Sequence, residues 1–139
     1  MHTIAASLIA AGAAITLLLG LMHLLYTYYG PKLSPRDPEL QARMQVVSPV
    51  ITRETTMWRA WIGFNASHSY GLILFGLVYG YLALAHRDFL FQSDFLLAVG
   101  LMLLFGYVFL AKRYFFRIPF LGVLLATAFY VSGLVVSRI

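Results

Sequence analysis

Polar side chains gather on one face of a long apolar segment, residues 58–85. At about 100° per residue, Asn65, His68 and Ser69 fall within about one third of the helix circumference. With a rise of about 1.5 Å per residue from Trp58, Asn65 lies roughly 10 Å and His68 roughly 15 Å into an apolar core about 30 Å thick. Polar groups at that depth usually face the interior of a helix bundle, so this face is a candidate functional site.

The first apolar segment, residues 3–29, carries a matching face. Its members are small or polar and align at helical spacing: Gly12, Thr16, Gly20, His23 and Thr27. On an antiparallel neighbour His23 lies close to the level of Asn65, and we expect the two side chains to be within reach of each other. A stripe in the fourth apolar segment, made of Gly122, Ala126, Tyr130, Gly133 and Ser137, predicts close helix packing.

Three kinds of chemistry could use these side chains. A bis-histidine haem would use His23 and His68, but the rise per residue places them about one helical turn apart in depth. A structural metal site needs three or four ligands, and the apolar segments hold no carboxylate to complete one. A proton or ion path normally has a mid-membrane acid, which is also missing. The cofactor stays unknown, and hydrogen bonding between helices is the alternative role for His23.

Two residues near the membrane surface complete the set. Arg59 is placed to hold the anionic part of a ligand, or simply to anchor the topology. Trp61 is placed at an aromatic belt, and a wall of a binding site is its alternative role. The predicted ligand-binding candidates are therefore Asn65, His68, His23, Ser69, Trp61 and Arg59, with no catalytic residue assigned and no metal expected.

Composition indicates that lipid surrounds these segments. Of 139 residues 61% are hydrophobic and 11% charged, and the mean hydropathy is +0.83, outside the range of soluble domains. Four windows are long enough to span a bilayer, at residues 3–29, 58–85, 95–110 and 118–136. No cysteine is present, which excludes thiolate chemistry and covalently attached haem. The net charge of +5 is scattered along the chain, so nucleic acid is not an expected partner.

The connections between the windows predict the architecture. Residues 30–57 form a polar loop in which Asp37-Pro38-Glu39 predicts a helix through about Val47. Ser48-Pro49 repeats this signal and predicts a second helix that continues into the second span. The other connections are short, so we expect a single all-α domain, an integral membrane four-helix bundle with antiparallel up-down topology.

Charge predicts the orientation of this bundle. The first and third loops with their flanks hold eight of the ten basic residues. The positive-inside rule therefore predicts a cytoplasmic 30–57 loop and both termini on the non-cytoplasmic side, in a bacterial inner membrane. The N-terminus has no basic region, so we expect a retained helix there and no cleaved signal peptide.

Short runs give the chain a resemblance to the MAPEG family. These are Arg59-Ala60, residues 76–79 and residues 117–122. The family comprises membrane glutathione transferases and eicosanoid synthases, and the resemblance implies four crossings, a long cytoplasmic first loop and a trimeric assembly. Residues 58–71 also resemble segments of small uncharacterised bacterial membrane proteins, which implies no known activity.

The chain departs from the MAPEG pattern where that family binds glutathione. The second span of the family usually reads Arg-Ala-His, then Asn two residues on and Glu three after that. Here the His, Asn and Glu positions of that pattern hold Trp61, Gly63 and Ala66. The asparagine of this chain, Asn65, lies two residues after the family's Asn position. Of the glutathione-binding residues, only Arg59 can be carried over.

Two functions follow as hypotheses. The first is intramembrane binding or processing of a lipophilic small molecule at the polar face of residues 58–85, with the lipid bilayer as surroundings. The alternative is a non-catalytic subunit or scaffold of a larger membrane complex, or a homo-oligomer, in which the polar faces join helices together. A channel or transporter ranks third, because charged residues are missing from the spans.

Overall fold

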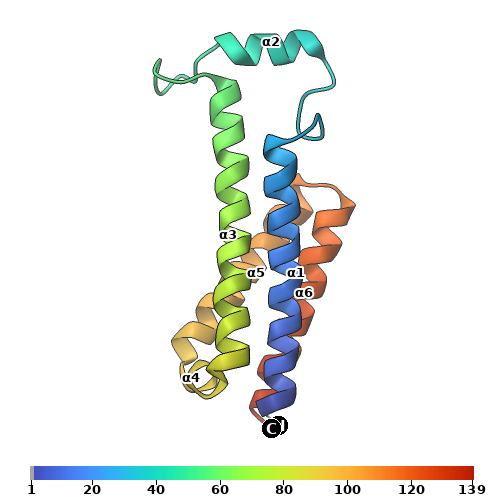
Figure 1. The fold of residues 1–139 in the computed structure, drawn as a ribbon, viewed down its shortest axis with the longest axis vertical. Helices are drawn as coiled ribbons and strands as arrows, with labels where there is room; N and C mark the ends of the chain where they lie inside the picture. Colours follow the sequence, from blue (N-terminus) through green and yellow to red (C-terminus); the bar gives the residue numbers. More distant parts are fainter. Residues whose placement is uncertain (1) are drawn as a thin grey trace. The chain divides into compact units, whose positions relative to one another are not determined.

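Helices account for the whole architecture of residues 2–139, the part of the chain that the structure describes. In the computed structural model these residues form six helices and no strand (Figure 1). The helices are α1 (His2–Tyr28), α2 (Pro38–Val46), α3 (Met57–Ala85), α4 (Arg87–Gln92), α5 (Asp94–Tyr114) and α6 (Arg117–Ser137). Four of them, α1, α3, α5 and α6, are long and apolar enough to cross a membrane. The prediction of an all-α protein with four such helices is confirmed.

The contacts between residues divide the chain into two compact units. Unit 1 comprises the chain up to Leu19 together with Leu72–Ile139, and unit 2 comprises Gly20–Gly71. Helices α1 and α3 therefore contribute residues to both units. All of the predicted site residues belong to unit 2.

The polar segment of unit 2 contains one helix, as Asp37 and Pro38 predict. The carboxylate of Asp37 accepts hydrogen bonds from the backbone N–H groups of Glu39 (2.9 Å) and Leu40 (3.4 Å), and Pro38 is the first helical residue. These are the contacts of a helix N-cap. The resulting helix α2 lies across the ends of the α1 and α3 segments of its unit (Figure 1).

The prediction that a second helix begins at Pro49 is wrong. Residues 47–56 are turns and bends, and α3 begins at Met57. This segment is rich in β-branched residues, and the Thr52 hydroxyl accepts a hydrogen bond from the Glu54 N–H (3.1 Å), which competes with helical bonding. The true N-cap of α3 is Thr56, whose hydroxyl accepts from the Arg59 N–H at 3.3 Å.

In unit 1, α5 is longer than predicted and α4 was not predicted. The α5 helix has 21 residues, because Asp94 in its first turn and Lys112 and Arg113 in its last turn suit the helix dipole. Ser93 caps it by accepting from the Leu96 N–H at 3.3 Å. The preceding connection, expected to be a loop, forms the six-residue helix α4.

Small residues set the helix spacing in unit 1. A Cβ atom added to Gly76 would lie 2.7 Å from the Ala13 carbonyl oxygen, and one added to Gly12 would lie 2.7 Å from that of Ala126. Such distances leave no space for a side chain, so the backbones approach directly. The predicted packing stripe of α6 is confirmed, since Ala126, Tyr130 and Gly133 are buried.

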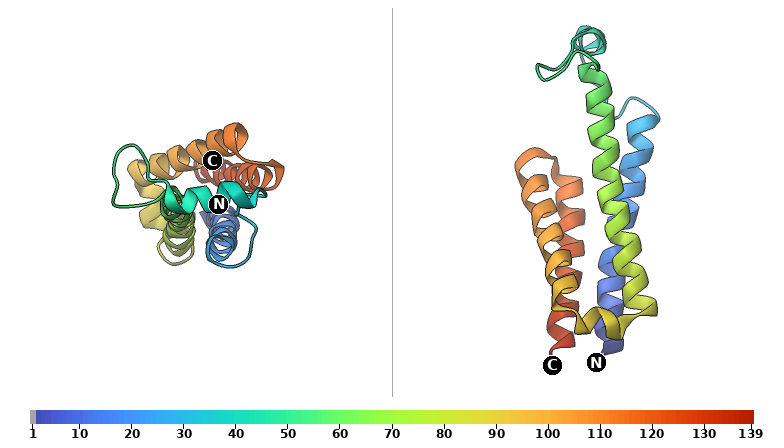
Figure 2. Two further views of the ribbon diagram at one scale, coloured as in Figure 1. Left: turned by 90° about the horizontal axis from the view of Figure 1, so that it is seen from above. Right: turned by 90° about the vertical axis from the view of Figure 1, so that its left-hand side faces the viewer.

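Two tyrosines place hydroxyl groups in this interior. The Tyr79 hydroxyl donates to the Leu96 carbonyl (2.7 Å) and the Tyr130 hydroxyl donates to the Leu97 carbonyl (3.1 Å). The two rings meet edge to face, with centroids 5.7 Å apart, against α5, which runs beside α6 (Figure 2). Both hydroxyls are thus satisfied by main-chain oxygens.

Candidate functional site

The centre of the site is a hydrogen bond between α1 and α3. The Asn65 side-chain N–H donates to the Trp61 carbonyl on its own helix (2.8 Å), which fixes the orientation of the amide. Its Oδ1 then faces His23 Nε2 at 3.1 Å, so Nε2 must carry the proton and donate. The Nδ1 atom of His23 is left with a lone pair that can accept a hydrogen bond or take a proton. The prediction that His23 and Asn65 are within reach is confirmed.

His68 lies closer to His23 than counting residues suggested. The two imidazole rings meet edge to face, with centroids 5.3 Å apart. Side chains in a helix lean toward its N-terminus, and the two segments run in opposite directions past each other. His23 and His68 therefore lean toward one another, which closes the helical turn that separates their backbones. Two imidazoles and one carboxamide form a single cluster, called here the His–Asn cluster (His23, Asn65 and His68).

Neighbouring hydroxyl groups are bonded within their own helices. Ser69 is fully buried and donates to the Asn65 carbonyl (2.9 Å), while Thr27 donates to the His23 carbonyl (2.8 Å). Hydroxyls bonded in this way have no proton left to donate to a ligand. Ser69, a predicted ligand contact, is thus placed to support Asn65.

A cavity of about 240 Å³ lies about one helical turn from the cluster, toward the C-terminal end of α1, since its lining includes Thr27, four residues after His23, and Ile62, three residues before Asn65. Thr27 links the two, because it lines the cavity and bonds to the backbone of His23. Aromatic and apolar side chains make up most of the lining, which consists of Tyr26, Thr27, Tyr28, Gly30, Leu33, Ser34, Trp58 and Ile62. The cavity is smaller than the 300–1,000 Å³ of sites that enclose a whole drug-sized ligand, so it suits one end of a longer molecule.

The chain after α1 folds back to form one wall of this cavity. Gly30 has a φ of +82°, a left-handed conformation that ends α1 and that glycine adopts without strain. Pro31 then accepts a turn hydrogen bond from the Ser34 N–H (3.0 Å). Trp61 holds the returning chain, because its Nε1–H donates to the Leu33 carbonyl at 3.0 Å. Trp61 therefore positions a wall of the cavity instead of lining it.

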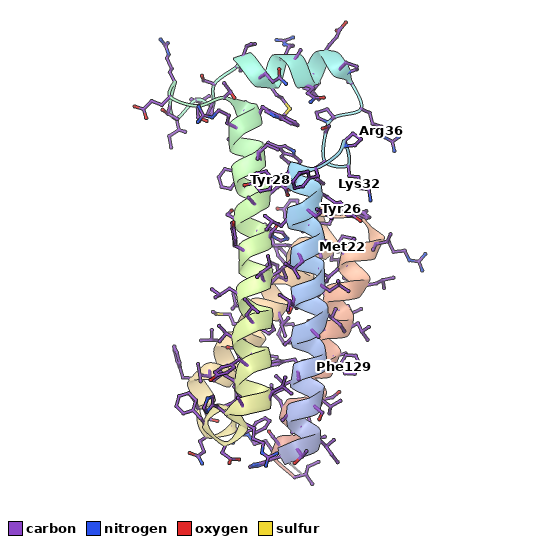
Figure 3. All side chains as sticks on the ribbon, in the orientation of Figure 1. Met22, Tyr26, Tyr28, Lys32, Arg36 and Phe129 are labelled. Carbon is purple, nitrogen blue, oxygen red and sulfur yellow. The ribbon has the colours of Figure 1, made fainter. Side chains whose placement is uncertain are left out.

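Basic side chains lie near this end of unit 2. The Lys32 Nζ atom lies 3.7 Å from the centroid of the Tyr26 ring, a cation–π contact beside the cavity (Figure 3). Arg59 is exposed in the first turn of α3, and within residues 2–139 its side chain forms no hydrogen bond or ion pair with the cluster. Lys32, which was not among the predicted site residues, is the cation beside the cavity.

The cluster does not match the ligand set of a metal or a haem. Across residues 2–139 no three His, Cys, Asp or Glu side chains come together. The edge-to-face contact of the His23 and His68 rings leaves no slot for a macrocycle between them, and His23 Nε2 is engaged by Asn65. What the cluster offers is hydrogen bonding and proton transfer by imidazole.

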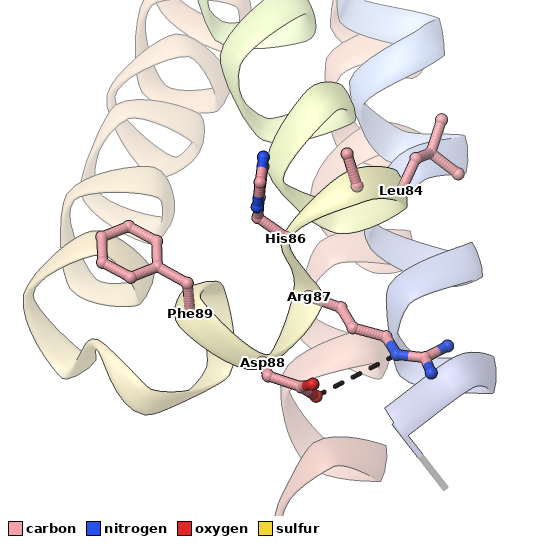
Figure 4. A pocket seen from close by; sticks show the side chains of 6 residues that line it. Leu84, His86, Arg87, Asp88 and Phe89 are labelled. Carbon is pink, nitrogen blue, oxygen red and sulfur yellow. Dashed lines mark ion pairs between the residues drawn. The ribbon is translucent and has the colours of Figure 1, made fainter.

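A second hollow, of about 460 Å³, lies in unit 1 at the turn between α3 and α4 (Figure 4). It is lined by six consecutive residues, Leu84 to Phe89, and is therefore the outer surface of a turn. Its polar groups bond to other parts of the protein: His86 to the Tyr81 hydroxyl (3.0 Å) and Arg87 to the Thr3 hydroxyl (3.0 Å). His2 and Arg87 pair with the Asp88 carboxylate at this surface (3.7 and 4.0 Å), but these side chains are exposed, so the candidate site is the one in unit 2.

Comparison with known proteins adds no assignment: no family model, no curated protein and no solved structure matches this chain. The resemblance to the MAPEG family stays a prediction.

Proposed function

We propose that unit 2 binds the polar end of a lipophilic molecule within the membrane, with the His–Asn cluster as its recognition group. The observation that carries this proposal is the contact of His23, Asn65 and His68 about one helical turn from a cavity of about 240 Å³. Joining two membrane helices needs one polar pair, and the second imidazole exceeds that requirement.

The size of the cavity supports a ligand that is only partly enclosed. A polar head would enter between Thr27 and Ile62, while an apolar chain would lie in lipid along the exposed surface of α1 and α3. His23 Nδ1 is the atom that would accept a hydrogen bond from a hydroxyl of the head or take its proton. Processing of the ligand would begin with that proton transfer.

Copurifying lipids test the proposal. Wild-type protein and the His23→Ala, Asn65→Ala and His68→Ala variants would be purified in mild detergent, and their bound lipophilic molecules extracted and compared by mass spectrometry. We expect at least one molecule to be enriched with the wild type and lost from the three variants, because they remove the recognition groups.

Ser67→Ala is the matched control, because Ser67 is exposed on the same helix and, among residues 2–139, its side chain bonds only to the Phe64 carbonyl (2.9 Å). This variant should keep the wild-type lipid profile. Identical profiles from all five proteins, with equal helix content by circular dichroism, would refute the proposal.

An exposed small-residue face on α3 favours a second candidate function, that of a non-catalytic subunit, scaffold or homo-oligomer. A Cβ added to Gly63 would meet nothing within 4 Å, and Ser67, four residues on, is also exposed. Such a face lets a helix of another chain approach closely. Gly63→Leu should then shift native-gel migration to a smaller species while leaving the bound lipids unchanged; unchanged migration would count against this function.

We also propose the orientation that charge predicts, with up-down topology, the 30–57 loop in the cytoplasm and both termini outside, in a bacterial inner membrane. The absence of cysteine allows a direct test with single-cysteine variants. Gln92→Cys should react with a membrane-impermeant maleimide added to spheroplasts, whereas Gln45→Cys should react only after permeabilisation. The opposite pattern would reverse the orientation.

A further inference from the structure

The segment between α2 and α3 is a closed loop with two apolar residues at its tip. The Met57 N–H donates to the Val47 carbonyl at 2.8 Å, which joins the ends of the 47–56 loop. At the tip, the Thr52 N–H donates to the Pro49 carbonyl (3.3 Å), so a turn presents Val50 and Ile51. The loop is therefore held in shape by its own hydrogen bonds.

These tip residues are unusually exposed. Val50 has a relative exposure of 109% and Ile51 of 91%, the highest values for large apolar side chains in residues 2–139. They do not belong to a membrane-crossing helix, so the lipid around the spans does not automatically cover them. Adjacent, fully exposed apolar side chains on an ordered loop mark an interaction site.

The position of the loop within unit 2 indicates its surroundings. The loop projects sideways from the start of α3, at the level of the first turn of that helix (Figures 1 and 2). This first turn carries Trp58, a residue type that concentrates where a membrane meets water. A sideways projection at that level runs along the membrane surface instead of away from it.

Charge around the tip matches a lipid surface. Arg53 is exposed two residues after Ile51, and residues 30–59 hold five basic and three acidic side chains. Basic residues beside an apolar insertion are attracted to anionic headgroups, which reinforces shallow burial of the apolar side chains.

We propose that the 47–56 loop inserts Val50 and Ile51 into the headgroup region of the bilayer that α3 crosses, with Arg53 at the phosphates of anionic lipids. The loop would then fix the depth of the α3 start, and with it the cavity of unit 2, relative to the membrane surface. This inference does not depend on whether the cavity binds a ligand.

Fluorescence of single-cysteine variants tests the insertion. Val50→Cys and Ile51→Cys would each be labelled with the environment-sensitive dye NBD and reconstituted in vesicles of phosphatidylcholine with or without phosphatidylglycerol. We expect blue-shifted emission, strong quenching by a nitroxide on the lipid acyl chain and weak quenching by aqueous iodide. Glu54→Cys, in the same loop but polar, is the matched control and should show the reverse.

Two results would overturn the proposal. Iodide quenching of the tip labels equal to that of Glu54→Cys would place the tip in water. Protection from both quenchers would place it against protein, such as a second copy of the chain. Added to the labelled Val50→Cys or Ile51→Cys protein, Arg53→Gln should weaken the nitroxide quenching only in vesicles that contain phosphatidylglycerol. Unchanged quenching in those vesicles would remove the role assigned to Arg53.

Discussion

The two units place polar groups among apolar helices in different ways. In unit 1 the hydroxyls of Tyr79 and Tyr130 donate to carbonyl oxygens of α5, and glycines bring the helix backbones together. In unit 2 two polar side chains, those of His23 and Asn65, bond to each other, and a cavity lies about one helical turn away. Of these two arrangements, only the second contains a titratable nitrogen.

This difference separates two uses of intramembrane polarity. A tyrosine bonded to a main-chain oxygen is satisfied, because it has donated its only proton. An imidazole bonded through one nitrogen keeps a second nitrogen for chemistry. By this comparison unit 1 is the packed part of the protein, and unit 2 is the part for which we propose recognition.

The largest effect on stability is expected from adding a side chain at Gly76, where two helix backbones of unit 1 meet. In Gly76→Ala the new Cβ would lie 2.6 Å from Leu17 Cβ and 2.7 Å from the Ala13 carbonyl oxygen, and the backbone oxygen cannot rotate away. Overpacking of this kind costs about 1–3 kcal/mol, more than alanine gains in helix propensity. Denaturation in mixed micelles should report this loss in the free energy of unfolding.

Gly63→Ala is the control for that substitution. Nothing lies within 4 Å of the added Cβ, so the protein should gain up to about 1 kcal/mol from helix propensity. If both variants lost the same stability, the direct backbone approach at Gly76 would not be what sets the helix spacing.

The next largest effect should be a coupling within the His–Asn cluster. His23→Ala, Asn65→Ala and the double variant form a cycle, and hydrogen bonds between membrane helices give coupling free energies of about 0.6–1.7 kcal/mol. We expect a value in that range from unfolding measurements in mixed micelles. Additive losses, with no coupling, would mean that the 3.1 Å contact contributes nothing to stability.

A smaller loss of stability is expected when the Tyr79 hydroxyl of unit 1 is removed. Tyr79→Phe removes a hydroxyl whose acceptor, the Leu96 carbonyl, lies within α5 and keeps its helical partner. No buried acceptor is orphaned, so the loss should be about 0.5 kcal/mol, the low end for a hydrogen bond. Unfolding of Tyr79→Phe in the same mixed micelles as the His23 and Asn65 variants would measure this loss of stability. A loss larger than that of Asn65→Ala would reverse the comparison between the units.

The sequence predicts best what depends on local pattern. Four apolar helices follow from hydropathy, and α2 follows from Asp37-Pro38. The contact of His23 with Asn65 followed from two helix faces and a common depth. These features need only the period of a helix and the thickness of a membrane.

What could not be predicted depends on side-chain direction and on chain reversal. The His23–His68 contact was missed because depth was counted along the backbone, whereas helical side chains lean toward the N-terminus. The cavity was missed because Gly30 turns the chain back, which brings Leu33 to Trp61. The Gly30-Pro31 pair after a run of tyrosines was the available signal for that turn.

The smallest effect on stability, and the most local one, is expected for Trp61→Phe. This change keeps an aromatic ring at the membrane surface but removes the Nε1–H that donates to the Leu33 carbonyl at 3.0 Å. Because Trp61 is 42% exposed, global stability should change by no more than about 0.5 kcal/mol. The wall of the cavity should nevertheless loosen, so trypsin should cut after the exposed Lys32 faster than in the wild type. Trp58→Phe is the control: it leaves the hydrogen bond between Trp61 and Leu33 intact, so this variant should be cut at the wild-type rate. Equal cleavage of both variants would mean that the cavity wall is held by something other than Trp61, and that the open space of unit 2 is less defined than the packed interior of unit 1.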